Sequence, residues 1–308
     1  MNDGIKDLVI IGGGPAGLTA GIYASRARLD AVLLEKGTYG GQVLSTSHIE
    51  NYPGFPDAVG GFELADLMHQ QAQKFGLKIE YRGIENITPE DGLLVLNTEE
   101  GPVRTKTAII ATGSVPNKLK VPGEEKLTGR GVSYCATCDG ALYRDQTVAV
   151  VGGGDAAVEE AIFLTRFAKR VEMIHWMDHL QATPILQEEA RANEKINIRW
   201  NTALTEIKGD EALKELALRD VETGETSSLP VDGLFIYIGI TPQVEFVKDL
   251  VEMDKAGSIV TDATMATSVP GLFAAGDVRS RSIRQVVSAV GDGATAAWYA
   301  YNYIQGMK

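Results

Sequence analysis

The chain has 308 residues, of which 44% are hydrophobic and 23% are charged, as expected for a soluble globular protein of about two domains. Its 29 basic and 41 acidic residues give a net charge of −12, which argues against a nucleic-acid backbone or an anionic membrane as partner. No apolar run approaches the roughly 18 residues that span a bilayer, and the first residues do not have the pattern of a signal peptide. We therefore expect a cytoplasmic protein.

The beginning of the chain has the pattern of a β-α-β unit. Residues 7–12 form a short apolar run rich in β-branched residues, which glycines and a segment of helical character, 16–24, follow. A second apolar strand at 31–35 closes a unit of about 30 residues.

The same pattern returns later in the chain. A strand at 146–152, a helix at 155–169 and a strand at 171–175 predict a second β-α-β unit, so the chain carries an internal repeat. The elements around this repeat are a buried strand at 106–113, a strand at 233–239, a strand at 271–276 and a long alanine-rich helix over about 282–304. Proline-containing connectors predict domain boundaries near residues 117 and 244.

These elements predict an α/β fold with two Rossmann-like dinucleotide-binding domains, the second inserted into the first. Residues 1–117 and 244–308 would form the first domain. Residues 118–243 would form the inserted pyridine-nucleotide-type domain, which carries both cysteines of the chain.

The first β-α-β unit carries a dinucleotide fingerprint. Gly12, Gly14 and Gly17 follow the strand and open the helix, and Glu35 ends the next strand. Such glycines allow a tight turn and the close approach of a pyrophosphate to a helix N-terminus, while the carboxylate accepts hydrogen bonds from a ribose. Because the context and the acid agree, the motif predicts a bound dinucleotide.

The second unit carries a similar motif whose ligand is less certain. Gly152, Gly154 and Ala157 occupy the three positions of the fingerprint. The segment after the second strand, 175–181, has no acid at the strand end for a 2′-hydroxyl and no arginine for a 2′-phosphate. A site that binds a nicotinamide nucleotide and a fold without a ligand both remain open.

Cys135 and Cys138 form a CxxC motif, and Asp139 follows directly. Two thiols at this spacing can close a small disulfide, and the motif can lower the pKa of one thiol so that it attacks as a thiolate. A zinc site would need about four ligands, and neither a second CxxC nor a grouped set of histidines is present. The pair therefore indicates redox chemistry without a metal. Asp139 is a candidate proton donor or acceptor, or alternatively a turn or cap residue.

Taken together, the motifs resemble the low-molecular-weight, bacterial-type thioredoxin reductases, and the resemblance extends over nearly all of residues 7–305. The motifs that carry it are Gly12-Gly-Gly-Pro-Ala-Gly17, Gly40-Gly-Gln42, Glu50-Asn-Tyr-Pro-Gly54, Ala111-Thr-Gly113, Cys135-Ala-Thr-Cys-Asp139, Gly152-Gly-Gly154, Gly276-Asp277 and Arg284-Gln285.

The resemblance implies an FAD-dependent disulfide reductase that acts on thioredoxin or a thioredoxin-like protein. It implies that Cys138 faces the flavin, that Cys135 attacks the partner's disulfide, and that Asp139 is the acid. It also implies a homodimer whose inserted domain rotates. The FAD site would comprise Gly12, Gly14, Pro15, Ala16, Gly17, Glu35, Gly41, Gln42, Asn51, Ala111, Thr112, Gly113, Gly276 and Asp277, with Arg284, Gln285 and Val286 against the flavin.

Two departures from the family pattern bear on the electron donor and the partner. NADPH-dependent members carry a His-Arg-Arg-x-x-x-Arg cluster, whereas this chain has His175, Trp176, Met177 and Gln181 at those positions. We therefore expect poor use of NADPH, and either NADH or a nicotinamide-independent donor such as reduced ferredoxin. Ala141-Leu142 replaces aromatic residues that help to receive thioredoxin, so the partner preference is expected to differ. The alternative functions are a flavin-dependent dithiol oxidase and a redox-sensing flavoprotein with little turnover.

Overall fold

The computed structural model describes residues 4–46, 49 and 51–307, and the chain divides into two compact units. Unit 1 comprises Met1–Val115 and Thr241–Lys308, and unit 2 comprises Pro116–Ile240. The boundaries expected from the sequence, near residues 117 and 244, lie within a few residues of these divisions. Unit 2 is thus an insertion in the chain of unit 1.

Unit 1 is built on a seven-stranded sheet in the order β3-β2-β1-β6-β5-β4, with β17 also paired to β6. The pairs among β3, β2, β1, β6 and β17 are parallel, whereas β4, β5 and β6 pair in antiparallel fashion. The strands are β1 (Lys6–Ile11), β2 (Ala31–Glu35), β3 (Lys78–Tyr81), β4 (Asn86–Glu90), β5 (Leu93–Asn97), β6 (Val103–Ile110) and β17 (Leu272–Ala274). The central strands are almost wholly buried, as both faces of a parallel sheet require.

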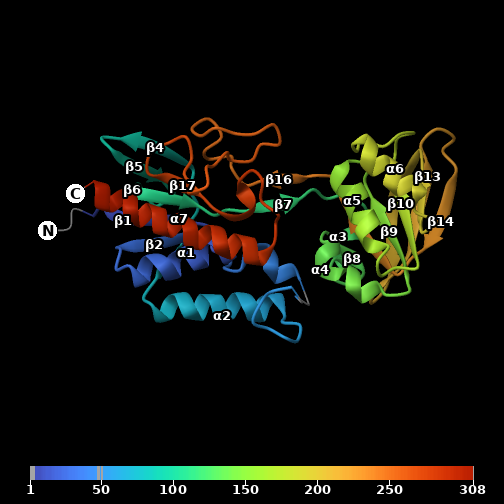
Figure 1. The fold of residues 1–308 in the computed structure, drawn as a ribbon, viewed down its shortest axis with the longest axis horizontal. Helices are drawn as coiled ribbons and strands as arrows, with labels where there is room; N and C mark the ends of the chain where they lie inside the picture. Colours follow the sequence, from blue (N-terminus) through green and yellow to red (C-terminus); the bar gives the residue numbers. More distant parts are fainter. Residues whose placement is uncertain (1–3, 47–48, 50, 308) are drawn as a thin grey trace. The chain divides into compact units, whose positions relative to one another are not determined.

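Among the described residues, the α-helices of unit 1 are α1 (Pro15–Arg26), α2 (Gly61–Lys74) and α7 (Val286–Gly306). Helices α1 and α7 contact the sheet, and α2 packs against α1. Helices α1 and α7 lie side by side although they are far apart in sequence (Figure 1). They meet closely because both carry small residues at the contact: a Cβ at Gly293 would lie 2.1 Å from the Ala16 carbonyl oxygen. The predicted C-terminal helix begins later than expected, since Arg284 has a φ of 54° and Gln285 is extended as the N-cap.

Two short strands, β7 (Ser114–Pro116) and β16 (Ile240–Pro242), carry the chain out of unit 1 and back into it. They pair with each other as a two-stranded sheet. Both connections to the inserted unit therefore run together.

Unit 2 contains a five-stranded parallel sheet in the order β11-β10-β9-β15-β8. These strands are β8 (Val132–Ser133), β9 (Thr147–Val151), β10 (Arg170–Ile174), β11 (Ile196–Arg199) and β15 (Gly233–Ile236). The helices are α3 (Glu124–Leu127), α4 (Ala136–Asp139), α5 (Asp155–Leu164) and α6 (Pro184–Ala192). Helix α5 ends before the expected residue 169 because backbone bonds from residue i to i−3, such as Phe167 N–H to Leu164, tighten the chain there.

A second, antiparallel sheet in unit 2 joins β12 (Thr202–Gly209), β13 (Leu213–Asp220) and β14 (Thr226–Pro230). Each unit thus has a predominantly parallel sheet of Rossmann type with its own hydrophobic core, so the α/β fold with two Rossmann-like domains is confirmed.

Over the described residues, no helix combines the length and apolar character needed to cross a membrane.

Candidate functional site

The first glycine motif forms a tight turn between β1 and α1. Gly12 has a φ of 105°, and a Cβ there would lie 2.5 Å from the Ala111 carbonyl oxygen. A Cβ at Gly17 would lie 1.9 Å from the Gly12 carbonyl oxygen, whereas one at Gly14 would meet no atom within 4 Å. The first and third glycines are therefore required by packing, and the second leaves open space at the N-terminus of α1, which begins at Pro15.

Glu35 lies beside this turn. One oxygen, Oε2, accepts a hydrogen bond from the Gly13 N–H at 2.7 Å, and Oε1 accepts one from the Gly37 N–H at 2.7 Å. Each carboxylate oxygen has a second lone pair that can accept a hydrogen bond from a hydroxyl group. The carboxylate is thus fixed by the backbone and still able to bind a ribose.

Three further predicted segments lie near the turn. Gly41 and Gln42 open the 3-10 helix η1 (Gly41–Ser45), and a Cβ at Gly41 would lie 3.4 Å from the Gly14 Cα. Gly276 opens the 3-10 helix η3 (Gly276–Val278), and a Cβ added at Gly276 would lie 3.1 Å from the Ala16 Cβ. The third segment follows β6 and consists of Ala111, Thr112 and Gly113.

The remaining predicted residues of unit 1 are held by side-chain hydrogen bonds. The Asn51 amide donates to Gln285 Oε1 at 2.9 Å, and Gln285 caps α7, whose first residue is Val286. Asp277 accepts a hydrogen bond from the Ser282 hydroxyl at 3.3 Å, and burial raises the pKa of its carboxyl group. Asn51, far away in the sequence, is thereby joined to the start of the last helix.

An ion pair that the sequence analysis missed supports η3. The Arg279 guanidinium binds Asp292 of α7 through two bonds, Nε to Oδ2 at 2.5 Å and Nη2 to Oδ1 at 2.8 Å. The Gly276 N–H also donates to Asp292 Oδ2, at 3.1 Å. This bidentate pair fixes the loop that carries Gly276 and Asp277 to α7.

In unit 2 the two cysteines form a disulfide with a Cα–Cα distance of 5.3 Å. Cys135 is the N-cap of α4, and Asp139 is the last residue of that helix. The Ser133 hydroxyl donates to Asp139 Oδ2 at 2.6 Å and accepts from the Cys135 N–H at 3.1 Å. The predicted acid is therefore held next to the disulfide by a serine that the sequence analysis did not identify.

Two tyrosine side chains near the disulfide, Tyr237 and Tyr143, were not predicted from the sequence. The Ala136 N–H, between the cysteines, donates to the Tyr237 hydroxyl at 2.6 Å. Burial raises the pKa of Tyr237, and the nearby Glu160 carboxylate raises it further. Tyr143 lies close by in η2 (Gly140–Tyr143), and burial, with a contribution from Asp139, raises its pKa to about 12.

The second glycine turn is built like the first. Gly152 has a φ of 144°, and a Cβ there would lie 2.3 Å from the Tyr237 carbonyl oxygen, whereas Gly154 faces open space. The buried His175 ring packs on Gly153, whose carbonyl oxygen accepts hydrogen bonds from the N–H groups of Gln181 and Ala182. The segment 175–181 is thereby folded against this turn.

The arginines on the neighbouring strands are occupied elsewhere. Arg170 Nε donates to Glu172 Oε1, and Arg199 Nε donates to Glu172 Oε2 at 2.7 Å. Glu172 is buried on β10, and its hydrogen bonds, which outweigh the effect of burial, lower its pKa. Trp176, which occupies a position of the arginine cluster, is 62% exposed.

Comparison with known proteins agrees with this arrangement. Residues 6–293 match the family described as pyridine nucleotide-disulphide oxidoreductase. The thioredoxin reductases of Listeria innocua and Treponema pallidum are each 44% identical to the chain; the alignments cover 99% and 98% of this chain and 95% and 98% of those proteins. The crystal structure of thioredoxin reductase from Streptococcus pyogenes is 45% identical with a TM-score of 0.95, and the match covers 99% of this chain and 100% of that chain.

The chain belongs to the pyridine nucleotide-disulphide oxidoreductase family. Within that family it resembles the thioredoxin reductases, so it is a flavoprotein oxidoreductase with FAD as its cofactor. The residues of unit 1 fit FAD, because the open N-terminus of α1 can receive a pyrophosphate and Glu35 retains acceptors for a ribose.

Proposed function

We propose that this disulfide reductase passes electrons through Cys135–Cys138 to thioredoxin or a thioredoxin-like protein. The observation that carries the proposal is the disulfide at the start of α4, with Asp139 hydrogen-bonded beside it. In the proposed FAD site, the α1 turn and Glu35 would hold the nucleotide, and Arg284, Gln285 and Val286 would contact the flavin. When bound, FAD supplies the two-electron chemistry that links a donor to the disulfide.

The cysteines and Asp139 then perform thiol–disulfide exchange. The Cys135 thiolate attacks one sulfur of the partner's disulfide and forms a mixed disulfide, and the partner's other sulfur leaves as a thiolate that takes a proton from Asp139. The Cys138 thiol returns a proton to Asp139 and attacks Cys135 Sγ. The Cys135–Cys138 bond forms again, and the partner's second sulfur leaves as a thiolate that takes this proton from Asp139, so the partner departs as a dithiol.

Replacement of either cysteine tests this assignment. Cys138→Ser should abolish turnover of thioredoxin, since a disulfide needs both sulfurs, while an artificial donor still bleaches the flavin. Cys135→Ser should also abolish turnover but leave the Cys138 thiol in place. Anaerobic absorbance spectra and a thioredoxin reduction assay measure the two half-reactions separately. Undiminished turnover in either variant would remove the assignment.

We further propose that NADPH is a poor donor and that NADH, reduced ferredoxin or another reductant serves instead. A 2′-phosphate needs charged, bidentate partners. The segment 175–181 supplies no arginine, and Arg170 and Arg199 are bound to Glu172. No acid at the strand end binds the free 2′-hydroxyl of NADH, which favours a nicotinamide-independent donor.

Anaerobic flavin bleaching with NADPH, NADH and reduced ferredoxin in parallel distinguishes these donors. The variant Trp176→Arg, Met177→Arg, Gln181→Arg should gain use of NADPH; His175 is left unchanged because it is buried. A matched control replaces Trp176 and Met177 with Gln and should gain nothing. Efficient bleaching of the unmodified protein by NADPH would contradict the proposal.

Hydrogen peroxide formed in proportion to thiol oxidation would identify the dithiol oxidase instead, and a lack of any dithiol turnover would identify a sensor.

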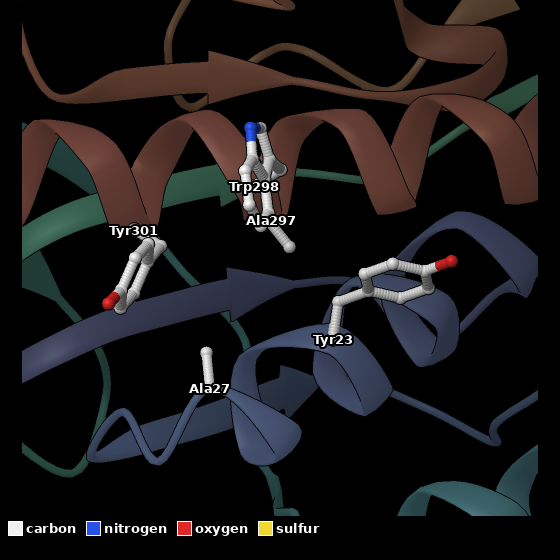
Figure 2. A pocket seen from close by; sticks show the side chains of 5 residues that line it. All are labelled: Tyr23, Ala27, Ala297, Trp298 and Tyr301. Atoms are coloured by element: carbon white, nitrogen blue, oxygen red, sulfur yellow. The ribbon is translucent and has the colours of Figure 1, made fainter.

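We also propose a homodimer formed through α1 and α7. Figure 2 shows Tyr23, Trp298 and Tyr301 around a pocket. The pocket has a volume of about 290 Å³, and Tyr23 and Trp298 are 49% and 58% exposed. Exposed aromatic residues that line a hollow are typical of protein interfaces. Trp298→Glu should convert a dimer to a monomer in analytical ultracentrifugation, whereas Phe62→Glu on α2, with Phe62 66% exposed, should leave it dimeric. A dimer that persists in Trp298→Glu would exclude this face.

A further inference from the structure

Behind the redox disulfide, unit 2 contains an acid that the exchange mechanism does not use. Glu160 lies on α5, the helix that packs against α4. Its Oε2 atom is buried and has no hydrogen-bond partner among the described residues. A buried carboxylate oxygen without a donor destabilises the ionised form, because water solvates that form better.

Tyr237 connects this acid to the disulfide. Its hydroxyl accepts the Ala136 N–H at 2.6 Å, directly between the two cysteines, and it lies close enough to Glu160 for the two groups to interact electrostatically. The titratable groups that act on this pair are Glu159 on α5 and Asp139 on α4. All of them are acids, so a new negative charge at the cysteines adds to existing repulsion.

We propose that Glu160 takes up a proton when a thiolate forms at the Cys135–Cys138 couple, and that it acts on the cysteines through Tyr237 as a positioning residue. Reduction breaks the S–S bond and adds two electrons, which leaves one thiol and one thiolate once a single proton has been bound by sulfur. A second proton on Glu160 keeps the net charge of this region unchanged. When the partner's disulfide takes the electrons, Glu160 releases its proton to solvent, and Asp139, which has protonated the partner, takes one up from solvent.

The charge state of Glu160 supports this role near neutral pH. Burial, with a smaller contribution from Glu159, raises the pKa of Glu160 to about 7. Below that pH the carboxyl group is neutral and does not oppose a thiolate. Above it the carboxylate is negative and raises the pKa of the cysteine thiols, so fewer thiolates are present.

The test is the alkylation rate of the reduced cysteines in the FAD-loaded protein. Dithiothreitol, which supplies two electrons and two protons, reduces the disulfide; after its removal without oxygen, iodoacetamide labels the thiols, and mass spectrometry locates the label. Since the thiolate is the reactive form, Glu160→Gln should react about three- to tenfold faster than the unmodified protein near pH 8, because one pKa unit changes the thiolate fraction about tenfold. Near pH 6 the two rates should agree.

Two further variants make the assignment specific. Glu159→Gln removes an exposed negative charge from the same helix. The alkylation rate of this variant should keep its dependence on pH, displaced to lower pH. Tyr237→Phe should accelerate alkylation at every pH, because the Ala136 N–H loses its acceptor and becomes available to sulfur. A ratio of Glu160→Gln to unmodified rates that stays constant from about pH 6 to 9, or a Glu159→Gln variant that matches Glu160→Gln, would overturn the inference.

Infrared spectroscopy tests the same point independently of whether Glu160→Gln folds. Reduction of the unmodified protein near pH 8 should increase the protonated-carboxyl band, and the absence of that increase would count against the proposal. The inference rests on the proposed role of Cys135–Cys138, but alkylation and infrared spectra do not measure turnover. Failure of the reductase assignment would appear in the cysteine variants and the thioredoxin assay instead.

Discussion

The ion pair between Arg279 and Asp292 allows a quantitative test of how unit 1 is held together. Their side chains are only 17% and 10% exposed, and Asp292 also accepts the Gly276 N–H. Asp292→Ala would leave a largely buried guanidinium without its carboxylate and an amide without its acceptor. Breaking a buried pair in this way costs about 3–5 kcal/mol, which at typical m-values corresponds to a urea midpoint lower by about 1–2 M.

The assay can be confined to unit 1. The chain has three tryptophans, and in a background with Trp176→Phe and Trp200→Phe the fluorescence of Trp298 reports on α7 alone. Urea unfolding of this background and of its Asp292→Ala variant gives the difference in the free energy of unfolding. Glu245→Ala is the matched control, because the Lys248–Glu245 pair is at least 50% exposed and is expected to contribute about 1 kcal/mol or less.

A double variant shows whether the unpaired charge is the cause. If it is, Asp292→Ala combined with Arg279→Ala should be less destabilised than the sum of the two single variants, because no buried charge remains. An Asp292→Ala variant no less stable than Glu245→Ala, or strictly additive single effects, would refute the explanation.

Three other outcomes are expected. Gly17→Ala should lower the stability of unit 1 and abolish FAD binding, because its Cβ would meet the Gly12 carbonyl oxygen. Gly14→Ala should fold normally and weaken only FAD binding. Circular dichroism and FAD titration distinguish the two variants, and equal stability of both would contradict the packing argument. Glu172→Gln should destabilise unit 2 by about 1–3 kcal/mol in urea unfolding, since two charge-assisted bonds are lost. Burial lowers the pKa of His175, so the unfolded state binds a proton on this residue more readily than the folded state does. The contribution of neutral His175 to the stability of unit 2 should therefore be fully present above about pH 6.5 and be lost as the pH falls below that value. His175→Gln should remove this part of the pH dependence in urea unfolding.

The features that could be predicted from the sequence are those with a local signal. The turn from Gly12 to Gly17 and the acid at Glu35 belong to one β-α-β unit, so spacing alone predicts that they meet. The cysteines are three residues apart in the sequence, a spacing that allows the disulfide observed between them.

The missed features depend on contacts between distant segments. Tyr237 and Ala136 are 101 residues apart, and no periodicity at either position indicates the hydrogen bond between them. Arg279 and Asp292 lie on a loop and a helix, and each alone has the pattern of an ordinary surface charge. The sequence pattern predicts too early a start for α7, because the left-handed backbone of Arg284 is a consequence of the loop geometry, which residue preferences do not show.

The disulfide of unit 2 joins residues only three positions apart. A crosslink stabilises a fold mainly by restricting the unfolded chain, and for so short a ring the chain-entropy estimate is about 2 kcal/mol, compared with nearly 5 kcal/mol for a loop of a hundred residues. Opening the bond therefore removes little conformational restriction from the unfolded state, and the parallel sheet and core of unit 2 do not depend on it. In the proposed reaction, breaking and re-forming this crosslink would therefore change the free energy of unfolding by about 2 kcal/mol, less than half of the change that a disulfide across a loop of a hundred residues would impose.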